Sequence, residues 1–281
     1  MVGNFLTRLD RIVRSRDSLL CVGLDPDPAD IPASLGGPAE SGRLTRFLDG
    51  ILRATSPHAA AFKCQLGSYL AFGTNGLTQL QRLTQRIGPN HLKILDLKAN
   101  DIPNTMRLVR DGAFGELGFD AVTVTPWLGW ETLEPFAEDP EHGIFVVAHS
   151  TNPGAPDFQE IPTPRGPLWL AVVSEVGRMA KAHGNAGVVV GATYSELLRA
   201  SRERLGEGVP ILIPGVGAQG GRLSVSVREG VDANGRALLV NSSRSILFAS
   251  SGPDWAEAAG AEARRLKEQI NQLRSGFRKA G

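Results

Sequence analysis

The stretch "LKILDLKANDIPNT", residues 92–105, runs from an apolar segment into three charged side chains. If the first half is a β-strand, its side chains alternate between two faces, and Asp96 and Lys98 project from the same face as Ile94. Asp101 follows beyond the end of this strand. A strand that ends in two opposite charges on one side predicts a polar site at its carboxyl end.

Seven further segments share this short, apolar, β-rich character, and amphipathic stretches typical of helices separate them. The eight predicted strands are "SLLCVGLD" (18–25), "AAAFKCQL" (59–66), "LKILDLKA" (92–99), "FDAVTVTP" (119–126), "GIFVVAHS" (143–150), "AGVVVGAT" (186–193), "VPILIPGV" (209–216) and "RALLVNSS" (236–243). Strands that alternate with helices pair in parallel, and eight of them close a (β/α)8 TIM barrel. An open doubly wound sheet is the alternative, but no G-x-G-x-x-G turn follows an early strand. We predict an α/β fold with a single barrel domain over residues 1–281.

Two segments depart from the repeating pattern. Residues 3–17 space their apolar side chains as an amphipathic helix does, which predicts an N-terminal helix and argues against a signal peptide. Residues 152–167, "NPGAPDFQEIPTPRGP", are rich in proline and lack a helical period. A long irregular segment after a strand is more often functional than filler, so we expect a lid or rim over the site.

The composition excludes several classes of protein. The chain has 281 residues, 42% hydrophobic and 21% charged, which is ordinary for a globular protein. Its net charge of +1 gives no field that would attract nucleic acid or an anionic membrane, and no apolar run is long enough to span a bilayer. Cys21 and Cys64 lie in apolar runs without metal-ligand spacing. We therefore expect buried thiols in a cytoplasmic setting, and neither a metal site nor a cofactor.

The carboxyl ends of the first three predicted strands carry charged side chains. Alternation directs Asp25 into the barrel mouth, and the second strand supplies Lys63. The third strand adds Asp96 and Lys98. One such charge alone is explained by solvation, but four in one concavity are a poor way to stabilise a core, because a broken buried pair costs roughly 3–5 kcal/mol. The pattern predicts a functional site.

The last two predicted strands lead into segments suited to a phosphate group. They are "IPGVGAQGG" (213–221), in which glycines let backbone N–H groups approach an anion, and "LLVNSSRSI" (238–246), in which a serine and an arginine open the next helix. The loops after strands seven and eight are the usual phosphate site of this fold, and guanidinium groups bind phosphate in a bidentate way. The residues expected to bind phosphate are Gly217, Gln219, Ser243 and Arg244.

Six motifs together carry a family resemblance. They are "VGLDPDP" (22–28), "AFKCQLGSYLAFG" (61–73), "LDLKANDIPNT" (95–105), "STNPGAPDFQ" (150–159), "PGVGAQGG" (214–221) and "LVNSSRSI" (239–246). With these motifs in this order, the sequence resembles the orotidine 5′-phosphate decarboxylase family, particularly its longer bacterial subgroup. The Asp-x-Lys-x-x-Asp pattern alone is shared with relatives that catalyse other reactions. Its combination with Lys63, Thr105 and the two phosphate segments is specific.

The resemblance implies an activity, an assembly and a set of roles. It implies decarboxylation of orotidine 5′-phosphate to UMP in de novo pyrimidine biosynthesis, by a homodimer with sites at the subunit interface. Asp101 and Thr105 would enter the partner's site, and Lys63, Asp96, Lys98 and Asp101 would form the charged array. Asp25 and Lys63 would bind ribose hydroxyls. Ser150, or Thr151 as the next candidate, would contact the pyrimidine or its carboxylate.

The chemistry of the reaction is consistent with these residues. Loss of CO2 from C6 of the pyrimidine leaves a carbanion that no electron sink relieves, so the site must act through electrostatics. We assign stabilisation and protonation of C6 to Lys98, and destabilisation of the substrate carboxylate to Asp96. The sequence departs from the subgroup at Ala99, Asn100 and Pro103, which bears on loop geometry. His149 is interpreted as a rim histidine.

Two rival functions are considered. The first is a metal-dependent sugar-phosphate decarboxylase or aldolase of the same superfamily, in which a carboxylate on the second strand helps to hold magnesium. Lys63 occupies that strand here, and a cation would repel the metal. The second is a non-catalytic nucleotide-binding barrel, which would need only the phosphate end and would tolerate Lys98→Ala.

Overall fold

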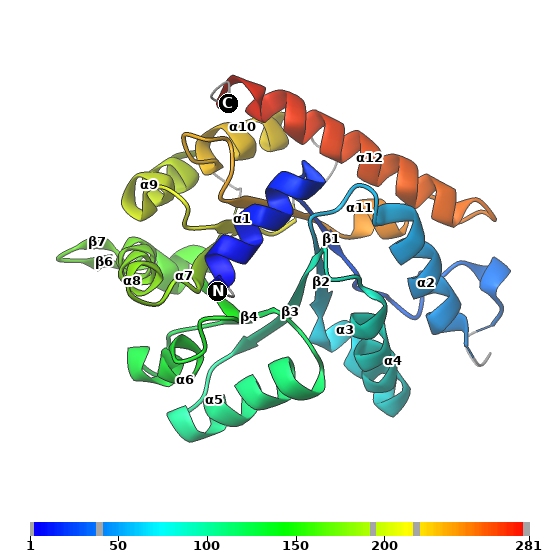
Figure 1. Ribbon diagram of the computed structural model, residues 1–281, viewed down its shortest axis with the longest axis horizontal. Coiled ribbons are helices and arrows are strands. Elements are labelled where there is room, and N and C mark those ends of the chain that lie inside the picture. Colours follow the sequence, from blue (N-terminus) through cyan, green and yellow to red (C-terminus); the bar gives the residue numbers. More distant parts are fainter. Residues whose placement is uncertain (1–2, 38–41, 192–194, 216–219, 278–281) are drawn as a thin grey trace.

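The computed structural model describes residues 3–37, 42–191, 195–215 and 220–277. Eight parallel strands close a barrel in the order β1-β10-β9-β8-β5-β4-β3-β2, so that each strand pairs with its neighbours along the chain (Figure 1). The strands are β1 (Leu20–Gly23), β2 (Ala61–Gln65), β3 (Leu92–Ala99), β4 (Ala121–Val124), β5 (Gly143–His149), β8 (Ala186–Val190), β9 (Ile211–Ile213) and β10 (Leu238–Ser242). The predicted barrel is confirmed, with each strand inside its predicted segment.

Helices surround the barrel because each buries one apolar face against it (Figure 1). The α-helices are α1 (Phe5–Arg16), α2 (Arg43–Thr55), α3 (Leu66–Leu70), α4 (Gly73–Arg86), α5 (Pro103–Arg110), α6 (Glu134–Ala137), α7 (Ala155–Gln159), α8 (Leu168–His183), α9 (Ser195–Leu205), α10 (Gly220–Gly230), α11 (Arg244–Leu247) and α12 (Trp255–Arg274). Short 3-10 helices span Ala33–Leu35, Trp130–Leu133 and Ser275–Phe277, and a π-helix spans Asp111–Glu116.

Helix α1 crosses the amino-terminal end of the barrel (Figure 1). Asn4 caps it by accepting a hydrogen bond from the backbone N–H of Thr7. Phe5 is fully buried, and its ring meets Phe145 edge-on with 6.1 Å between the centroids. A Cβ at Gly143, where β5 begins, would lie 2.4 Å from the Phe5 ring, so the close approach requires glycine there. The helix therefore closes this end with apolar packing.

The segment 152–167 is more ordered than its sequence indicates. It folds as the short helix α7 followed by a small antiparallel hairpin of β6 (Pro162–Thr163) and β7 (Gly166–Pro167). The Thr163 hydroxyl donates to the carbonyl of Gly166 at 2.6 Å and closes the turn. This hydrogen bond helps to order the segment, and hydrophobic periodicity cannot predict a contact of this kind.

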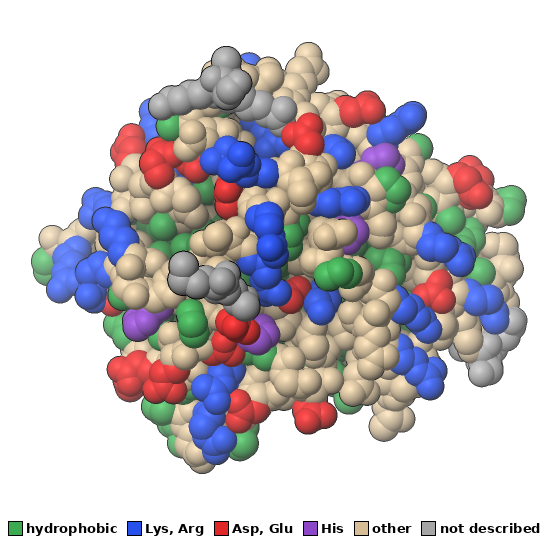
Figure 2. All heavy atoms as spheres, viewed as in Figure 1, with side chains coloured by type: hydrophobic (Ala, Val, Ile, Leu, Met, Phe, Trp, Pro, Cys, Tyr) green, Lys and Arg blue, Asp and Glu red, His purple; other side chains and the backbone are tan. Residues whose placement is uncertain are grey.

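The surface in Figure 2 shows the face that carries α1, where basic and acidic side chains are intermixed. This mixture agrees with the near-neutral net charge of +1. Across the described residues, every helix is too short or too polar to cross a lipid bilayer.

Candidate active site

Three charged side chains predicted to meet do meet at the carboxyl ends of β2 and β3. The Lys63 Nζ lies 3.0 Å from Asp96 Oδ2, and the Lys98 Nζ lies 2.6 Å from Asp96 Oδ1. One carboxylate therefore bridges two ammonium groups. The Lys63 side chain is only 6% exposed, whereas that of Lys98 is 50% exposed. Lys98 is thus the cation of this cluster that a bound molecule can reach.

The cluster holds Lys63 and Asp96 in their charged forms. Burial alone would lower the pKa of Lys63, but Asp25 and Asp96 outweigh it and hold that pKa above its ordinary value. Burial would raise the pKa of Asp96, but Lys63, Lys98 and hydrogen bonds from Lys98 and Thr123 lower it to about 2. At neutral pH Lys63 and Asp96 therefore form a fixed ion pair at the centre of the cluster.

The backbone at Lys98 departs from regular strand geometry. Lys98 has φ +51°, in the left-handed region that residues other than glycine rarely adopt. Leu95 pairs with Val122 and Ala99 pairs with Val124, so three residues of β3 bulge opposite Thr123 alone. Regular alternation of side chains, which the sequence predicted, is interrupted at this bulge. The bulge nevertheless leaves Lys98 in contact with Asp96.

Thr123 supports this bulge and was not predicted from the sequence. Its Oγ1 accepts the backbone N–H groups of Leu97 and Lys98, both at 3.0 Å, and donates to Asp96 Oδ1 at 2.8 Å. The hydroxyl replaces the strand-pairing bonds that the bulge removes. The stretch "AVTVTP" does not by itself identify Thr123 as the support of the bulge. That role follows only from the pairing register of β3 with β4.

Asp25 joins the cluster from β1, as predicted. Its Oδ2 lies 3.6 Å from the Lys63 Nζ, and its Oδ1 accepts the backbone N–H of Gln65 at 2.9 Å. A Cβ at Gly23 would lie 2.7 Å from the Ser243 Cβ and 2.9 Å from Asp25 Oδ2. Glycine at this position lets the end of β10 approach the charged cluster.

The phosphate end is only partly described. The Ser243 Oγ is buried and makes no hydrogen bond with any described residue. Arg244 begins α11 and is exposed. Gly217 and Gln219 lie outside the described residues.

The residues predicted from the resemblance to act across a dimer interface are Asp101 and Thr105. Asp101 is exposed, and its carboxylate accepts the N–H of Ile102 at 2.7 Å. In the described part of the chain, no hydrogen bond or ion pair links Asp101 to Asp96 or the two lysines. Thr105 is half-buried on α5.

Ser150 and Thr151 follow β5, which lies two strands along the barrel from β3. The Ser150 Oγ contacts Asn152 Oδ1 and lies 3.2 Å from Gln159 Oε1. Thr151 is exposed. His149, interpreted as a rim histidine, is the last residue of β5 and is 2% exposed. Both of its ring nitrogens lie within hydrogen-bonding distance of oxygen atoms.

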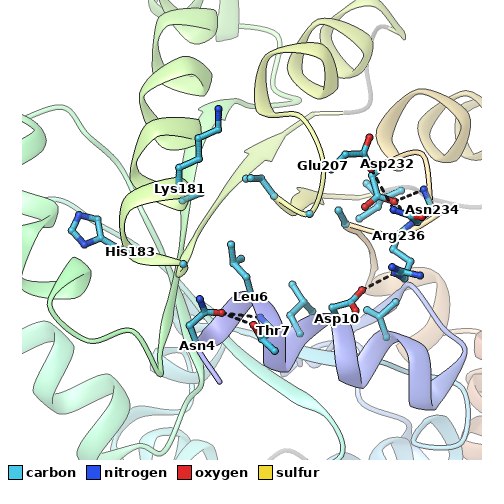
Figure 3. A pocket seen from close by; sticks show the side chains of 18 of the residues that line it. Asn4, Leu6, Thr7, Asp10, Lys181, His183, Glu207, Asp232, Asn234 and Arg236 are labelled. Atoms are coloured by element: carbon cyan, nitrogen blue, oxygen red, sulfur yellow. Dashed lines mark hydrogen bonds and ion pairs between the residues drawn. The ribbon is translucent and has the colours of Figure 1, made fainter. Parts of the chain in front are cut away.

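A cavity of about 620 Å³ lies at the opposite end of the barrel, between α1 and the segments that lead into β8, β9 and β10 (Figure 3). Its charged groups are largely engaged with each other and with backbone. Asp10 pairs with Arg236 at 2.7 Å, and Asp232 accepts the backbone N–H groups of Asn234 and Arg236. Figure 3 shows His183 pointing away from these groups. The cavity belongs to the scaffold, far from the cluster at the carboxyl ends.

No set of three or more His, Cys, Asp or Glu side chains is gathered to hold a metal ion within the described ranges. The polar groups concentrated at the mouth are instead ammonium groups, carboxylates and hydroxyls. This donor set suits an anionic substrate with hydroxyl groups.

A closed parallel barrel with ionised side chains at the carboxyl ends of its strands is the architecture of a (β/α)8-barrel enzyme. Comparison with known families makes the assignment specific. The model of the orotidine 5′-phosphate decarboxylase / HUMPS family matches residues 18–259, and the chain belongs to this family.

Relatives with this name align over nearly the whole chain. Orotidine 5′-phosphate decarboxylase of Bordetella avium is 41% identical, and the alignment covers 96% of this chain and 100% of that protein. The Thermomicrobium roseum protein of the same name is 39% identical, with 96% of each chain covered. Among solved structures, Leishmania donovani OMP decarboxylase superimposes with a TM-score of 0.82 at 29% identity, covering 97% of this chain and 99% of that one.

Proposed function

We propose that this protein decarboxylates orotidine 5′-phosphate to UMP and CO2 in pyrimidine biosynthesis, without a cofactor, at the charged cluster of the barrel mouth. The observation that carries the mechanism is the half-exposed Lys98 ammonium, held 2.6 Å from a carboxylate that is itself fixed by Lys63 and Thr123. Family membership and full-length relatives carry the reaction itself.

Lys98 is proposed to stabilise and then protonate C6. When the bond from C6 to the carboxylate carbon breaks, the electron pair stays on C6 and CO2 leaves. The ammonium of Lys98, fixed beside this position, lowers the energy of the developing charge, and preorganised stabilisation of this kind usually contributes most to the rate. Its proton then passes to C6, and the resulting amine regains a proton from water. Because the ammonium stabilises the C6 carbanion directly, the proposed mechanism requires no electron sink.

Asp96 is proposed to act on the substrate carboxylate. The negative charge of Asp96 is permanent at neutral pH, because two ammonium groups and a hydroxyl hold its pKa at about 2. A substrate carboxylate placed beside it is destabilised in the ground state, and this repulsion disappears when CO2 departs. Asp96 thereby serves two purposes, since it also orients Lys98.

The remaining substrate groups are assigned by position. Asp25 and Lys63, linked at 3.6 Å, would bind the ribose hydroxyls. Ser150, or Thr151 next to it, would contact the pyrimidine, and the segment 152–167 that follows would cover the mouth. The residues proposed to bind phosphate are Gly217, Gln219, Ser243 and Arg244. The unpaired, buried Ser243 Oγ supports this assignment, and phosphate binding would supply remote binding energy.

We further propose a cytoplasmic homodimer in which Asp101 and Thr105 complete the partner's site. Large apolar side chains are exposed around the mouth, near these two residues, and the Trp127 side chain is the most exposed of them at 63%. Five of the exposed large apolar residues are Ile102, Leu108, Trp127, Leu128 and Phe158. An exposed apolar group of this kind is typical of a protein interface. Cys21 and Cys64 are free and buried, in keeping with a reducing compartment.

The test adds orotidine 5′-phosphate in the presence of EDTA and follows its absorbance together with the appearance of UMP. We expect turnover by the wild type and its near-complete loss in Lys98→Ala. Lys93→Ala, on the same strand but distant from the cluster, is the control and should retain activity. Absence of wild-type turnover would overturn the proposed reaction, and binding of UMP without turnover would favour the non-catalytic alternative. Undiminished turnover in Lys98→Ala would overturn the proposed role of this lysine.

A further inference from the structure

His149 is a buried histidine whose two ring nitrogens both face oxygen acceptors. The Nδ1 lies 2.8 Å from the backbone carbonyl oxygen of Ser150, and the Nε2 lies 3.0 Å from Glu160 Oε1. A carbonyl oxygen can only accept, so the Nδ1 donates to it. The ring therefore bridges the Ser150 carbonyl and the Glu160 carboxyl group.

The short helix α7, which Glu160 follows, also binds the backbone N–H of Ser150. Gln159 ends α7, and its Oε1 accepts the backbone N–H of Ser150 at 2.8 Å. Glu160 follows Gln159 directly and reaches Ser150 through His149. The N–H and the carbonyl of one residue are therefore both anchored to the carboxyl end of α7.

Gly191, the residue that follows β8, also contacts this segment. The Gly191 N–H donates to the carbonyl of His149 at 2.8 Å. A Cβ at Gly191 would lie 2.8 Å from the Thr151 Cγ2 and 2.9 Å from the Ser150 carbonyl oxygen. The chain at residues 149–151 is thus held between the end of β8 and the carboxyl end of α7.

We infer that His149 and Glu160 are a positioning pair, which fixes the Ser150–Thr151 backbone in the orientation that meets the pyrimidine. This inference rests on the proposed function, because Ser150 and Thr151 matter to catalysis only as substrate contacts. The pair ties α7 to β5 across the segment that is proposed to cover the mouth. Loss of the pair should weaken substrate binding more than it slows the chemical step at Lys98.

The strand β5 supplies an internal control at its other end. His142 precedes β5, and its Nδ1 lies 2.8 Å from Asp139 Oδ2. This second histidine–carboxylate pair is built from similar groups but lies at the amino-terminal end of the same strand. A purely structural role for such pairs would give the two ends equal kinetic consequences.

The experiment measures kcat and KM for orotidine 5′-phosphate, and the dissociation constant of UMP, in Glu160→Gln, His149→Asn and the double variant. Glu160 is 40% exposed, so its substitution leaves the core intact even if that of His149 does not. We expect KM and the UMP dissociation constant to rise about tenfold in each single variant, with kcat changed by less than about threefold. The double variant should be no worse than the poorer single variant, because Glu160 acts on Ser150 only through His149.

His142→Asn should leave KM and the UMP dissociation constant at the wild-type values. The inference is wrong if Glu160→Gln binds UMP and substrate as the wild type does, if the two single effects multiply in the double variant, or if His142→Asn raises KM equally. Wild-type turnover together with its loss in Lys98→Ala tests the proposed function separately, so a failure of either can be told from a failure of the other.

Discussion

The two ends of the barrel use the same strands but treat buried charge differently. At the amino-terminal end, Asp120 pairs with Arg8 at 2.8 Å and accepts the backbone N–H of Lys93 at 2.8 Å, so its two oxygens are satisfied by the scaffold. At the carboxyl end, Asp96 holds two ammonium groups, and the Lys98 ammonium is half-exposed. At the amino-terminal end the charge of Asp120 is therefore neutralised within the scaffold. At the carboxyl end the ammonium of Lys98 stays accessible from the barrel mouth.

Backbone geometry follows the same division. Apolar packing of α1, with Phe5 against Phe145, closes the amino-terminal end. The carboxyl end carries the bulge of β3 and the left-handed backbone of Lys98. Such strain persists only where surrounding contacts hold it, and it concentrates at functional sites. The amino-terminal end is thus built from apolar packing, whereas the carboxyl end, where the proposed site lies, carries backbone strain.

The sharpest test of this contrast compares two buried aspartates. Asp96→Asn should lower turnover on the order of 10³-fold, because it removes the charge that fixes Lys98 and opposes the substrate carboxylate. Asp120→Asn should lower the free energy of unfolding but leave kcat/KM of the folded protein within about twofold of wild type. Steady-state kinetics and urea unfolding of both variants decide the matter. Equal losses of turnover would erase the distinction between the two ends.

Phe5→Ala tests the amino-terminal end from the side of stability. Removing this fully buried ring should lower the free energy of unfolding by about 3–5 kcal/mol, because it leaves a cavity beside Phe145. The turnover number of the protein that remains folded should not change. Urea denaturation and active-site titration measure the two quantities, and a fall in turnover per folded molecule would show that α1 contributes to the site.

Thr123 allows the bulge to be tested with nearly isosteric variants. Thr123→Val removes the hydroxyl and leaves the N–H groups of Leu97 and Lys98 without their acceptor, so turnover should fall about 10- to 100-fold. Thr123→Ser keeps the hydroxyl and should recover most of the activity. Thr55→Val, which removes a buried hydroxyl from α2, should cost stability alone. Activity in Thr123→Val equal to that in Thr123→Ser would contradict the proposed support of Lys98.

The depressed pKa of Asp96 predicts a dependence of stability on pH. Its pKa falls from 3.8 to about 2 on folding, so the unfolded chain takes up this proton first as the pH is lowered. The stabilisation from this group is fully present above about pH 4 and is lost as the pH falls to about 2, and it amounts to about 2 kcal/mol. Urea midpoints measured across this interval should fall less steeply in Asp96→Asn than in wild type. Identical slopes would mean that other carboxylates account for the acid sensitivity.

Hydrophobic periodicity was sufficient to predict the barrel, because every strand is short, apolar and bounded by a helical pattern. Side-chain alternation predicted that Lys63, Asp96 and Lys98 would meet, and they do meet at the carboxyl ends of adjacent strands, although a bulge and not regular alternation places Lys98. Alternation could not reveal the bulge, which depends on the pairing of β3 with β4. The role of Thr123 in holding it was hidden for the same reason.

The interaction of His149 with Glu160 was also beyond the sequence. The two are 11 positions apart in the sequence, and they meet only because α7 folds back onto the end of β5. The segment between them has no periodicity from which this return could be predicted. Asp101 is a different case, because its proposed partner lies in a second copy of the chain.

Exchange of the C6 proton of UMP in D2O, followed by proton NMR, is the most stringent test of the proposed carbanion chemistry. A cluster that stabilises a carbanion at C6 must also promote loss of the proton from the product, since the same intermediate is reached from UMP. We expect the wild type to introduce deuterium at C6 far faster than buffer alone does, and Lys98→Ala to lose this ability. Exchange at the rate of free UMP with the wild type, or equal exchange with Lys98→Ala, would show that the cluster does not stabilise the carbanion.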